Sequence, residues 1–203
     1  MIDTAGLLSR LYLVRHGETA WSLSGQHTGR TDMPLIEQGE EDARKLAERL
    51  HRVIFSRVFT SPLRRARRTC ELAGLDEFAE IEPDLAEWDY GEYEGRRLVE
   101  IRDGRPGWNL FRDGCPGGES PAQVGERADR LIARLRTMAG NIAVFTHGSF
   151  GRALAVRWIG LPVMEAEHFL LGTASLGILG HGHDLAEEPA IVLWNSAAND
   201  ILA

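Results

Sequence analysis

Two histidines follow apolar segments in the same way and are the residues best suited to chemistry. The segment 11–14 ends in Arg15-His16-Gly17, and the segment 144–146 ends in His147-Gly148. If both segments are parallel neighbouring strands, both imidazoles emerge at one sheet edge, where ligands bind in open α/β folds. Arg15 adds a positive charge there, so we expect an anion site that contains a nucleophile or an acid–base group.

Two further segments supply charges of opposite sign. Ser61-Pro62-Leu63 forms another strand-to-helix junction, and four arginines come directly after it, namely Arg64, Arg65, Arg67 and Arg68. Helical spacing points these side chains in different directions. We therefore expect one arginine in the site and the others in solvent or beside acidic partners. Glu87 lies among large apolar residues, a setting suited to a carboxylic acid that exchanges a proton.

Two histidines, two arginines and a carboxylic acid suit phosphoryl transfer. A neutral imidazole can attack phosphorus, while guanidinium groups and a second imidazole hold the equatorial oxygens, where charge is spread. The carboxylic acid can protonate the leaving oxygen and later activate water. Because cationic side chains supply the positive charge, this chemistry requires no metal and no cofactor.

Composition limits the class of protein. The chain has 203 residues and a formal net charge of −7, which argues against general nucleic-acid binding and permits a small anionic substrate. It has no apolar run long enough to span a bilayer, and its first residues do not resemble a secretory signal. Cys70 and Cys115 lack metal-ligand spacing, so a reduced cytoplasmic protein is expected, with a disulfide between them as the alternative.

Alternation of apolar strands with amphipathic helices predicts an α/β layered fold. The expected strands are 10–15, 53–60, 141–146, 175–181 and 190–195. The expected helices are 37–50, one capped by Ser61 with Pro62 at its first position, 119–139 and 149–160. Residues 16–35 and 104–118 are expected to be loop, since both are rich in Gly and small or turn-forming residues.

Several motifs occur together in one order along most of the chain. They are residues 13–19 (LVRHGET) with Trp21, 28–32 (TGRTD), 61–66 (SPLRRA), Glu87 with Tyr90-Gly91, and His147-Gly148. In these motifs the sequence resembles the histidine phosphatase superfamily, in the branch that includes cofactor-dependent phosphoglycerate mutase. The resemblance implies a three-layer α/β/α fold with a mostly parallel central sheet. It also implies a single domain over 1–203, with a loop-rich insertion around 92–120 covering the site.

The resemblance also implies roles for individual residues. His16 matches the phosphohistidine nucleophile, Arg15 and Arg65 the phosphate-binding arginines, His147 the second pocket histidine, and Glu87 the proton donor. The candidate phosphate and substrate contacts are Ser22, Thr28, Gly29, Tyr90, Gly148, Ser149 and Arg152. Ser22 stands where many relatives have Asn.

A closer resemblance is to a subgroup with yeast sedoheptulose-1,7-bisphosphatase and some bacterial acid phosphatases. It rests on residues 21–26, 87–95, 108–115 and 173–177. Arg152 occupies the place of a substrate-phosphate arginine, whereas Ser149 stands where the subgroup often has His. The expected substrate is a small phosphorylated metabolite, a sugar phosphate or bisphosphate.

The sequence favours hydrolysis over a phosphoglycerate mutase reaction, which stays the alternative. Leu98 occupies the position of a mutase lysine, and the Gly/Pro-rich segment 104–118 replaces a longer insertion with paired arginines. A long polar segment beside a site often closes over substrate, and 104–118 is a candidate for this. The segment 190–203 could supply an interface strand, so a homodimer is possible.

Overall fold

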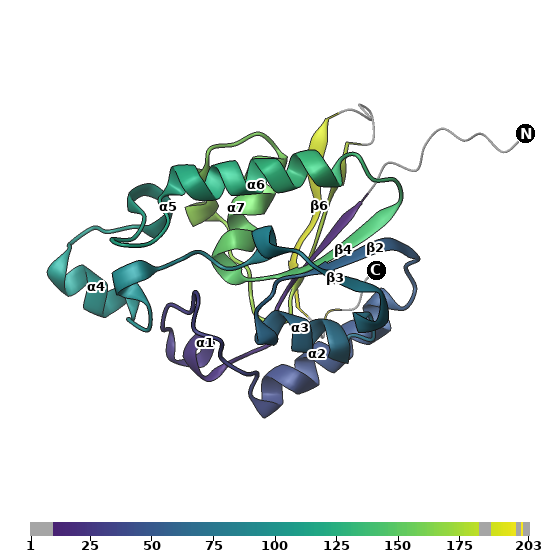
Figure 1. Cartoon of the computed structure of the whole chain (residues 1–203), viewed down its shortest axis with the longest axis horizontal. Helices are drawn as coiled ribbons and strands as arrows, with labels where there is room; N and C mark the ends of the chain where they lie inside the picture. The colour runs from purple at the N-terminus through teal and green to yellow at the C-terminus, as the bar shows by residue number, and fades with distance from the viewer. Residues whose placement is uncertain (1–9, 183–187, 198–199, 201–203) are drawn as a thin grey trace, which may run out of the picture.

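The computed structural model describes residues 10–182, 188–197 and 200, and the described chain is built on one six-stranded sheet (Figure 1). The strands have the order β3-β2-β4-β1-β5-β6. Their bounds are β1 Leu11–Arg15, β2 Phe55–Thr60, β3 Ala79–Ile81, β4 Asn141–Thr146, β5 Leu176–His181 and β6 Pro189–Ser196. The first four strands of that order are mutually parallel, whereas β5 and β6 run antiparallel to their neighbours. The ends of β1 and β4 therefore lie side by side.

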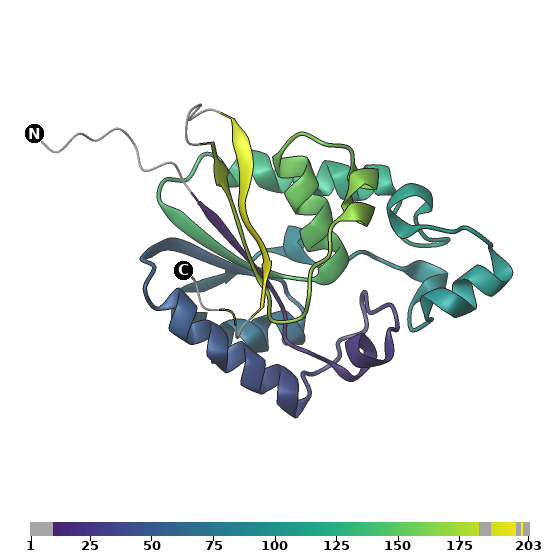
Figure 2. The ribbon, with the colours of Figure 1, turned by 180° about the vertical axis from the view of Figure 1, so that it is seen from behind.

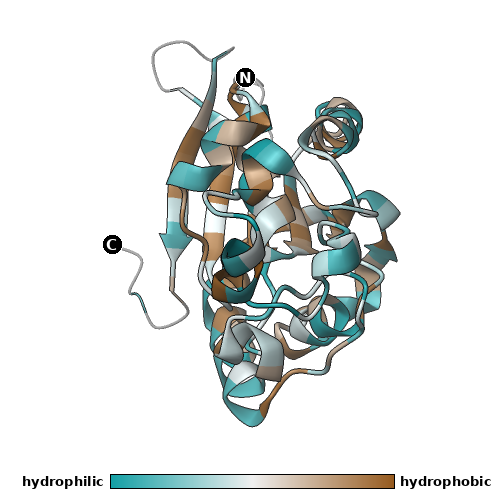
Figure 3. Cartoon of the chain, turned by 90° about the vertical axis from the view of Figure 1, so that its left-hand side faces the viewer, coloured by the Kyte–Doolittle hydropathy of each residue, from teal (hydrophilic) through white to brown (hydrophobic). Residues whose placement is uncertain are grey.

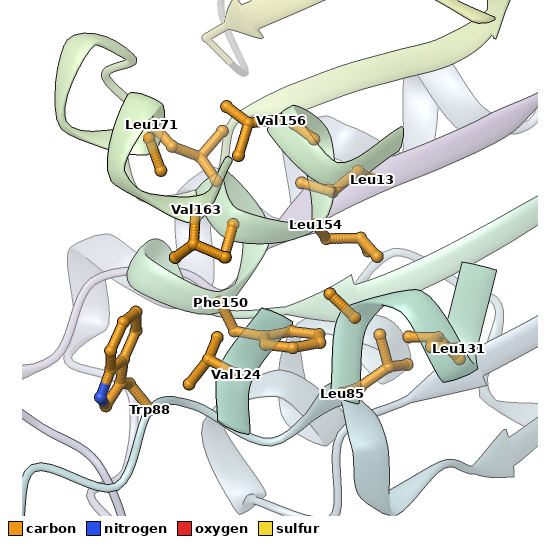
Figure 4. Close-up of a cluster of buried hydrophobic side chains, with 14 of the residues drawn as sticks. Leu13, Leu85, Trp88, Val124, Leu131, Phe150, Leu154, Val156, Val163 and Leu171 are labelled. Carbon is orange, nitrogen blue, oxygen red and sulfur yellow. The ribbon is translucent and has the colours of Figure 1, made fainter. Parts of the chain in front are cut away.

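Alternation along the central strands divides the core between the two faces of the sheet. In β1, Leu11 and Leu13 belong to one buried cluster, whereas Tyr12 and Val14 belong to the other. This division results from the two-residue period of a strand. Figure 4 shows part of the first cluster, in which Leu13 lies with Phe150, Leu154 and residues from neighbouring elements.

Helices cover both faces and complete the three layers (Figures 1 and 2). Their bounds are α1 Ala20–Ser24, α2 Glu37–Leu50, α3 Arg64–Leu72, α4 Leu98–Gly104, α5 Leu110–Asp113, α6 Pro121–Leu135 and α7 Gly148–Trp158. Helices α2 and α3 cover one face, and α6 and α7 cover the other. Many residues of the peripheral helices are hydrophilic, whereas the strands between the helix layers are richer in hydrophobic residues (Figure 3). The predicted three-layer α/β fold with a mostly parallel sheet is confirmed.

The strands and the long helices lie close to their predicted positions. Helix 37–50 is confirmed with the same bounds, and strand 141–146 likewise. The helix predicted over 119–139 is shorter, because a capping box between Ser120 and Gln123 begins it at Pro121 and it ends at Leu135. Strand β3 was not predicted, since its three residues are too short to show a periodic pattern.

Other local predictions were wrong for identifiable reasons. Helix α3 begins at Arg64 rather than at Pro62, because the Ser61 backbone N–H still donates to the Phe145 carbonyl of β4 (2.9 Å). The expected loop 16–35 contains α1, which a capping box between Thr19 and Ser22 stabilises.

The segment 92–120 is more ordered than its predicted loop character. It contains α4 and α5, and α5 lies within the 104–118 segment that was expected to be loop. Asn109 caps α5 by accepting a hydrogen bond from the Phe111 backbone N–H (2.9 Å). In Figures 1 and 2 these helices lie to one side of the sheet, and α5 lies beside the end of α6. In the described part of the chain, no helix is long and apolar enough to cross a bilayer.

The backbone after β1 touches the start of α2 directly. A Cβ placed on Gly17 would lie 2.3 Å from the Gly39 carbonyl oxygen, and one on Gly39 would lie 2.2 Å from the Glu18 carbonyl oxygen. Both obstacles are backbone atoms, which cannot rotate away. This contact fixes the loop that carries His16 against α2.

We expect Gly39→Ala to lower the free energy of unfolding by about 1–3 kcal/mol, the usual cost of overpacking. Urea titration at neutral pH measures this. Gly104→Ala is the matched control, since a Cβ on Gly104 meets no atom within 4 Å. Equal stabilities of the two variants would show that the backbone contact is not tight.

Candidate active site

A cavity of about 240 Å³ lies at the sheet edge where β1 and β4 end. Nine of the predicted site residues line it, namely Arg15, His16, Ser22, Thr28, Glu87, Tyr90, Gly148, Ser149 and Arg152. Arg65, His147 and Gly29 do not line it and lie behind its wall. The rings of His16 and His147 are 5.2 Å apart between centroids. The strand-end arrangement of both histidines is therefore confirmed, whereas a direct place in the cavity is found only for His16.

His16 has the protonation pattern of a nucleophile. Its Nδ1 lies 2.7 Å from the Gly17 carbonyl oxygen. Because a carbonyl only accepts, Nδ1 carries the proton and Nε2 is left with its lone pair. Burial, and after it the charges of Arg65 and Arg15, hold the pKa of His16 well below its usual value. The ring is therefore neutral near pH 7, with Nε2 available for attack.

Arg15 is prepared for an anion. The Nη1 of Arg15 donates a hydrogen bond to the Leu171 carbonyl oxygen. Its Nε is buried and has no hydrogen-bond partner. An unsatisfied buried donor costs about 1–3 kcal/mol, which a bound phosphate oxygen would recover. A Cβ on Gly148 would lie 3.2 Å from Arg15 Cζ, so glycine there leaves the guanidinium its place.

Arg65 is the arginine of its group that enters the protein, as predicted. It is fully buried, whereas Arg64 and Arg67 are exposed and Arg68 pairs with Glu40 and Glu71. The other three arginines line a separate hollow of about 530 Å³ beside α3.

The Arg65 guanidinium organises the wall behind His16. It donates to the carbonyls of Thr31, Thr28 and Gly29 at 2.9–3.0 Å and to His147 Nδ1 at 3.1 Å. These four bonds use four of its five N–H groups. The fifth has no acceptor among the described residues.

Both ring nitrogens of His147 are occupied. Nδ1 accepts from Arg65 Nε, so Nε2 carries the proton and donates to Ser61 Oγ at 2.7 Å. The ring is fully buried. Burial and the charge of Arg65 hold its pKa well below the usual value. His147 therefore lies in the structure as a neutral link between two strand-end segments, rather than as a ligand lining the cavity.

Glu87 is held from three directions. Oε1 accepts from the backbone N–H groups of Trp88 and Phe150, both at 2.8 Å, and Oε2 accepts from that of Ser149 at 3.0 Å. Two of these donors belong to the first turn of α7, which is favourable for a carboxylate. Among the described residues that line the cavity, Glu87 is the only acidic one. This position suits the predicted role of Glu87 as proton donor.

Tyr90 and Ser149 form a polar pair beside Glu87. The Tyr90 hydroxyl lies 2.7 Å from Ser149 Oγ. Burial and the charge of Glu87 hold the pKa of Tyr90 well above its usual value, so the phenol keeps its proton. One hydroxyl hydrogen joins the pair, so the other hydroxyl can donate one hydrogen bond to a ligand oxygen in the cavity.

The loop residues Ser22, Thr28 and Gly29 are tied mainly to the protein. Ser22 Oγ completes the capping box of α1 with Thr19. Thr28 Oγ1 donates to the Gln26 carbonyl (3.2 Å), and the Gly29 N–H donates to the Glu94 carboxylate (2.9 Å). Gly29 thus serves the site through its carbonyl, which accepts from Arg65.

Arg152 offers charge at another part of the cavity wall. Its Nε donates to the Ala166 carbonyl (2.9 Å), and its guanidinium lies 4.4 Å from the Phe111 ring centroid. Its terminal nitrogens make no hydrogen bond with described residues. They are free to bind an anionic or hydroxyl group.

Four cavity residues were absent from the predicted set, namely Gly25, Gln26, His27 and Leu171. The first three lie between the matched motifs and show no spacing of their own. Their place results from pairing of Gln26 with Arg97, which is a tertiary contact.

The two buried histidines make stability depend on pH. Unfolded histidine has a pKa near 6.5, whereas the folded values of His16 and His147 are lowered. Below pH 6.5 the unfolded chain takes up protons that the folded chain does not, so stability falls as pH falls. Between pH 7.5 and 5.5 each ring should lower the free energy of unfolding by about 1 kcal/mol.

Urea titrations at the two pH values measure this loss. His16→Gln removes one titrating ring, so its free energy of unfolding should fall by about 1 kcal/mol less than that of the unchanged chain over the same interval. Identical pH dependence in both proteins would mean that His16 is protonated equally in the folded and unfolded states.

The cysteines and the acidic residues add no further centre in the described part of the chain. Cys70 and Cys115 are both free thiols, so the alternative of a disulfide between them is not realised in this structure. Within residues 10–182, 188–197 and 200, no group of three or more His, Cys, Asp or Glu side chains is arranged to hold a metal ion.

Comparison with known proteins agrees with this arrangement. A family model described as histidine phosphatase superfamily (branch 1) matches residues 11–197, and the chain belongs to this superfamily. An acid phosphatase of Mycobacterium tuberculosis is 43% identical over 182 residues, which cover 88% of this chain and 89% of the relative. Sedoheptulose 1,7-bisphosphatase of Saccharomyces cerevisiae is 34% identical over 251 residues, covering 92% and 93%.

The solved structures support the same relationship. The structure of an open reading frame of Mycobacterium tuberculosis has a TM-score of 0.87 and 38% sequence identity, and covers 94% of this chain and 99% of that chain. The predicted family membership is therefore confirmed by sequence and by fold.

Proposed function

We propose that this protein is a phosphomonoesterase that transfers a phosphoryl group first to His16 and then to water. The observation that carries the proposal is the position of His16, a buried imidazole whose Nδ1 lies 2.7 Å from the Gly17 carbonyl oxygen, which leaves Nε2 without a partner among the described residues. His16 lines a cavity that Arg15 also lines and that Arg65 backs. A nucleophile beside two guanidinium groups suits a phosphate monoester.

In the first step the Nε2 lone pair of His16 forms the N–P bond. The bond between phosphorus and the ester oxygen breaks, and that oxygen takes a proton from the carboxylic acid form of Glu87. The unpaired Arg15 N–H groups bind the oxygens that gain charge, and the Arg65 guanidinium adds positive charge from behind the cavity wall. The positive charge comes from the protein itself, and the proposed reaction uses no metal or cofactor.

In the second step water attacks the phosphorus of phospho-His16. Glu87, now a carboxylate, takes one proton from the water, the N–P bond breaks, and phosphate is released. The three backbone donors that hold Glu87 keep it in one place through both steps. His147 and Ser61 keep Arg65 in position rather than bind phosphate directly.

We propose a small phosphorylated metabolite as substrate, a sugar phosphate or bisphosphate. Its support is the small polar cavity, together with the similarity to a sedoheptulose 1,7-bisphosphatase and an acid phosphatase. Arg152, Tyr90 and Ser149 are the proposed contacts to the part of the substrate beyond the reacting phosphate, with Ser22, Thr28 and Gly148 at the phosphate end.

The same proposal extends to the surroundings of the site. The chain is proposed to act as one domain in the cytoplasm, which suits its free thiols, with 92–120 covering the site. Trp108 of this segment packs against His27 of the cavity wall at 5.6 Å between ring centroids, which supports that cover.

A homodimer through β6, an edge strand, is a further proposal that sedimentation of the purified protein tests.

Phosphate release from a panel of esters tests the function. The panel contains sedoheptulose and fructose bisphosphates, phosphoglycerates, nucleotides and p-nitrophenyl phosphate, each with and without EDTA. We expect a kcat/KM of at least about 10⁴ M⁻¹s⁻¹ on one sugar phosphate, unaffected by EDTA. Uniformly poor hydrolysis with interconversion of phosphoglycerates would instead establish a mutase.

A further inference from the structure

His27 lines the same cavity as His16 and has no part in the steps above. Its position is fixed by contacts on several sides. Its backbone N–H and its Nδ1 both reach the Arg96 carbonyl, at 2.9 and 2.8 Å. Its ring meets the rings of Tyr90 and Trp108 edge to face, at 4.8 and 5.6 Å between centroids. The ring is therefore held in one orientation before any ligand binds.

This orientation decides what His27 offers to a ligand. The Arg96 carbonyl can only accept, so the Nδ1 carries the proton and the neutral ring keeps a lone pair on Nε2. Burial lowers the pKa of His27 and so favours the neutral form. No described residue donates a hydrogen bond to this Nε2. His27 thus carries a free acceptor nitrogen, and it lines the cavity together with Arg15 and Arg152, which carry donors.

A hydrogen-bond acceptor such as the neutral Nε2 of His27 favours ligand groups that can donate a hydrogen bond. Phosphate oxygens of a dianion only accept hydrogen bonds and gain nothing from a neutral Nε2, whereas a hydroxyl group can donate to it. The charged donors of the cavity suit the phosphate, and His27 suits the alcohol part of the substrate. A site that binds a hydroxyl discriminates strongly against analogues that lack it.

We propose that His27 is a specificity-determining residue whose Nε2 accepts a hydrogen bond from a substrate hydroxyl. It thereby selects phosphate monoesters of polyhydroxylated compounds over those of plain alkyl alcohols. This inference rests on the proposed phosphomonoesterase function and assigns to one side chain the preference for sugar-like substrates.

The test compares ribose 5-phosphate with n-pentyl phosphate, which share a five-carbon skeleton and differ in hydroxyl groups. The measured quantity is the ratio of kcat/KM for the two esters. In His27→Phe, which keeps the ring contacts with Tyr90 and Trp108 but removes both nitrogens, this ratio should fall at least about tenfold. His27→Gln restores a polar group and should recover part of the ratio.

His168→Gln is the control, because His168 is exposed and lies outside the cavity lining, and its ratio should equal that of the unchanged protein. A ratio unaltered by His27→Phe, or no preference for the sugar ester in the unchanged protein, overturns the assignment of His27. Absence of phosphate release from both esters and from the whole ester panel overturns the proposed function as well. The two failures are thus distinguished by whether the unchanged protein hydrolyses any ester.

Discussion

Replacement of His16 by alanine is expected to reduce phosphate release by about 10⁴- to 10⁶-fold, the scale on which loss of a covalent nucleophile acts. The variant retains Arg15, Arg65 and Glu87 but has no atom that can form the N–P bond. His147 cannot take its place, because both ring nitrogens of His147 are bound, one to Arg65 and the other to Ser61. Initial rates on the best ester of the panel measure the loss.

A second measurement ties the loss to the intermediate. Brief reaction with a ³²P-labelled ester, and then denaturation in base, should label the unchanged protein with an acid-labile phosphoryl group. His16→Ala should carry none. His51→Ala, which changes a histidine outside the cavity lining, should label and hydrolyse normally. Labelling of the His16 variant would place the nucleophile elsewhere.

Replacement of Glu87 by glutamine is expected to reduce kcat by about 10²- to 10⁴-fold, the usual contribution of general acid–base catalysis. An amide cannot give up a proton to the leaving oxygen or take one from water. Its NH₂ group also meets at least one of the three backbone N–H donors that hold the carboxylate, because these donors are divided between the two carboxylate oxygens. Rates with alkyl phosphates should fall most.

The leaving group provides the internal check on this role. p-Nitrophenolate leaves without a proton, so single-turnover formation of phospho-His16 from p-nitrophenyl phosphate should be much less affected in Glu87→Gln than formation from an alkyl phosphate. Glu92→Gln changes an exposed carboxylate outside the cavity lining and is the matched control. Equal losses with both leaving groups would show that Glu87 acts only in positioning.

Much of the site could be predicted because its residues sit at junctions that short sequence patterns define. An apolar run ending in Arg15-His16-Gly17 specifies a buried strand with a guanidinium and an imidazole at its end. The repeat of this pattern at His147 brings both histidines to one edge of a parallel sheet. Arg65 could be separated from Arg64 and Arg67 because helical spacing and the family motif agree. Glu87 could be assigned from its motif and its apolar neighbours.

The amino-acid sequence alone was therefore enough to predict the α/β layering, the histidines at the strand ends, and His16, Arg15, Arg65 and Glu87 as candidate site residues. The folded arrangement determined how these groups are used. The fold brings His147 to its two hydrogen-bond partners, Ser61 and Arg65, and Arg65 lies 82 positions away in the sequence. These bonds hold the His147 ring behind the cavity wall. The fold also puts His27 on the cavity wall through Arg96. Periodicity records which face of an element is buried, whereas a hydrogen-bond partner depends on how distant segments pack together.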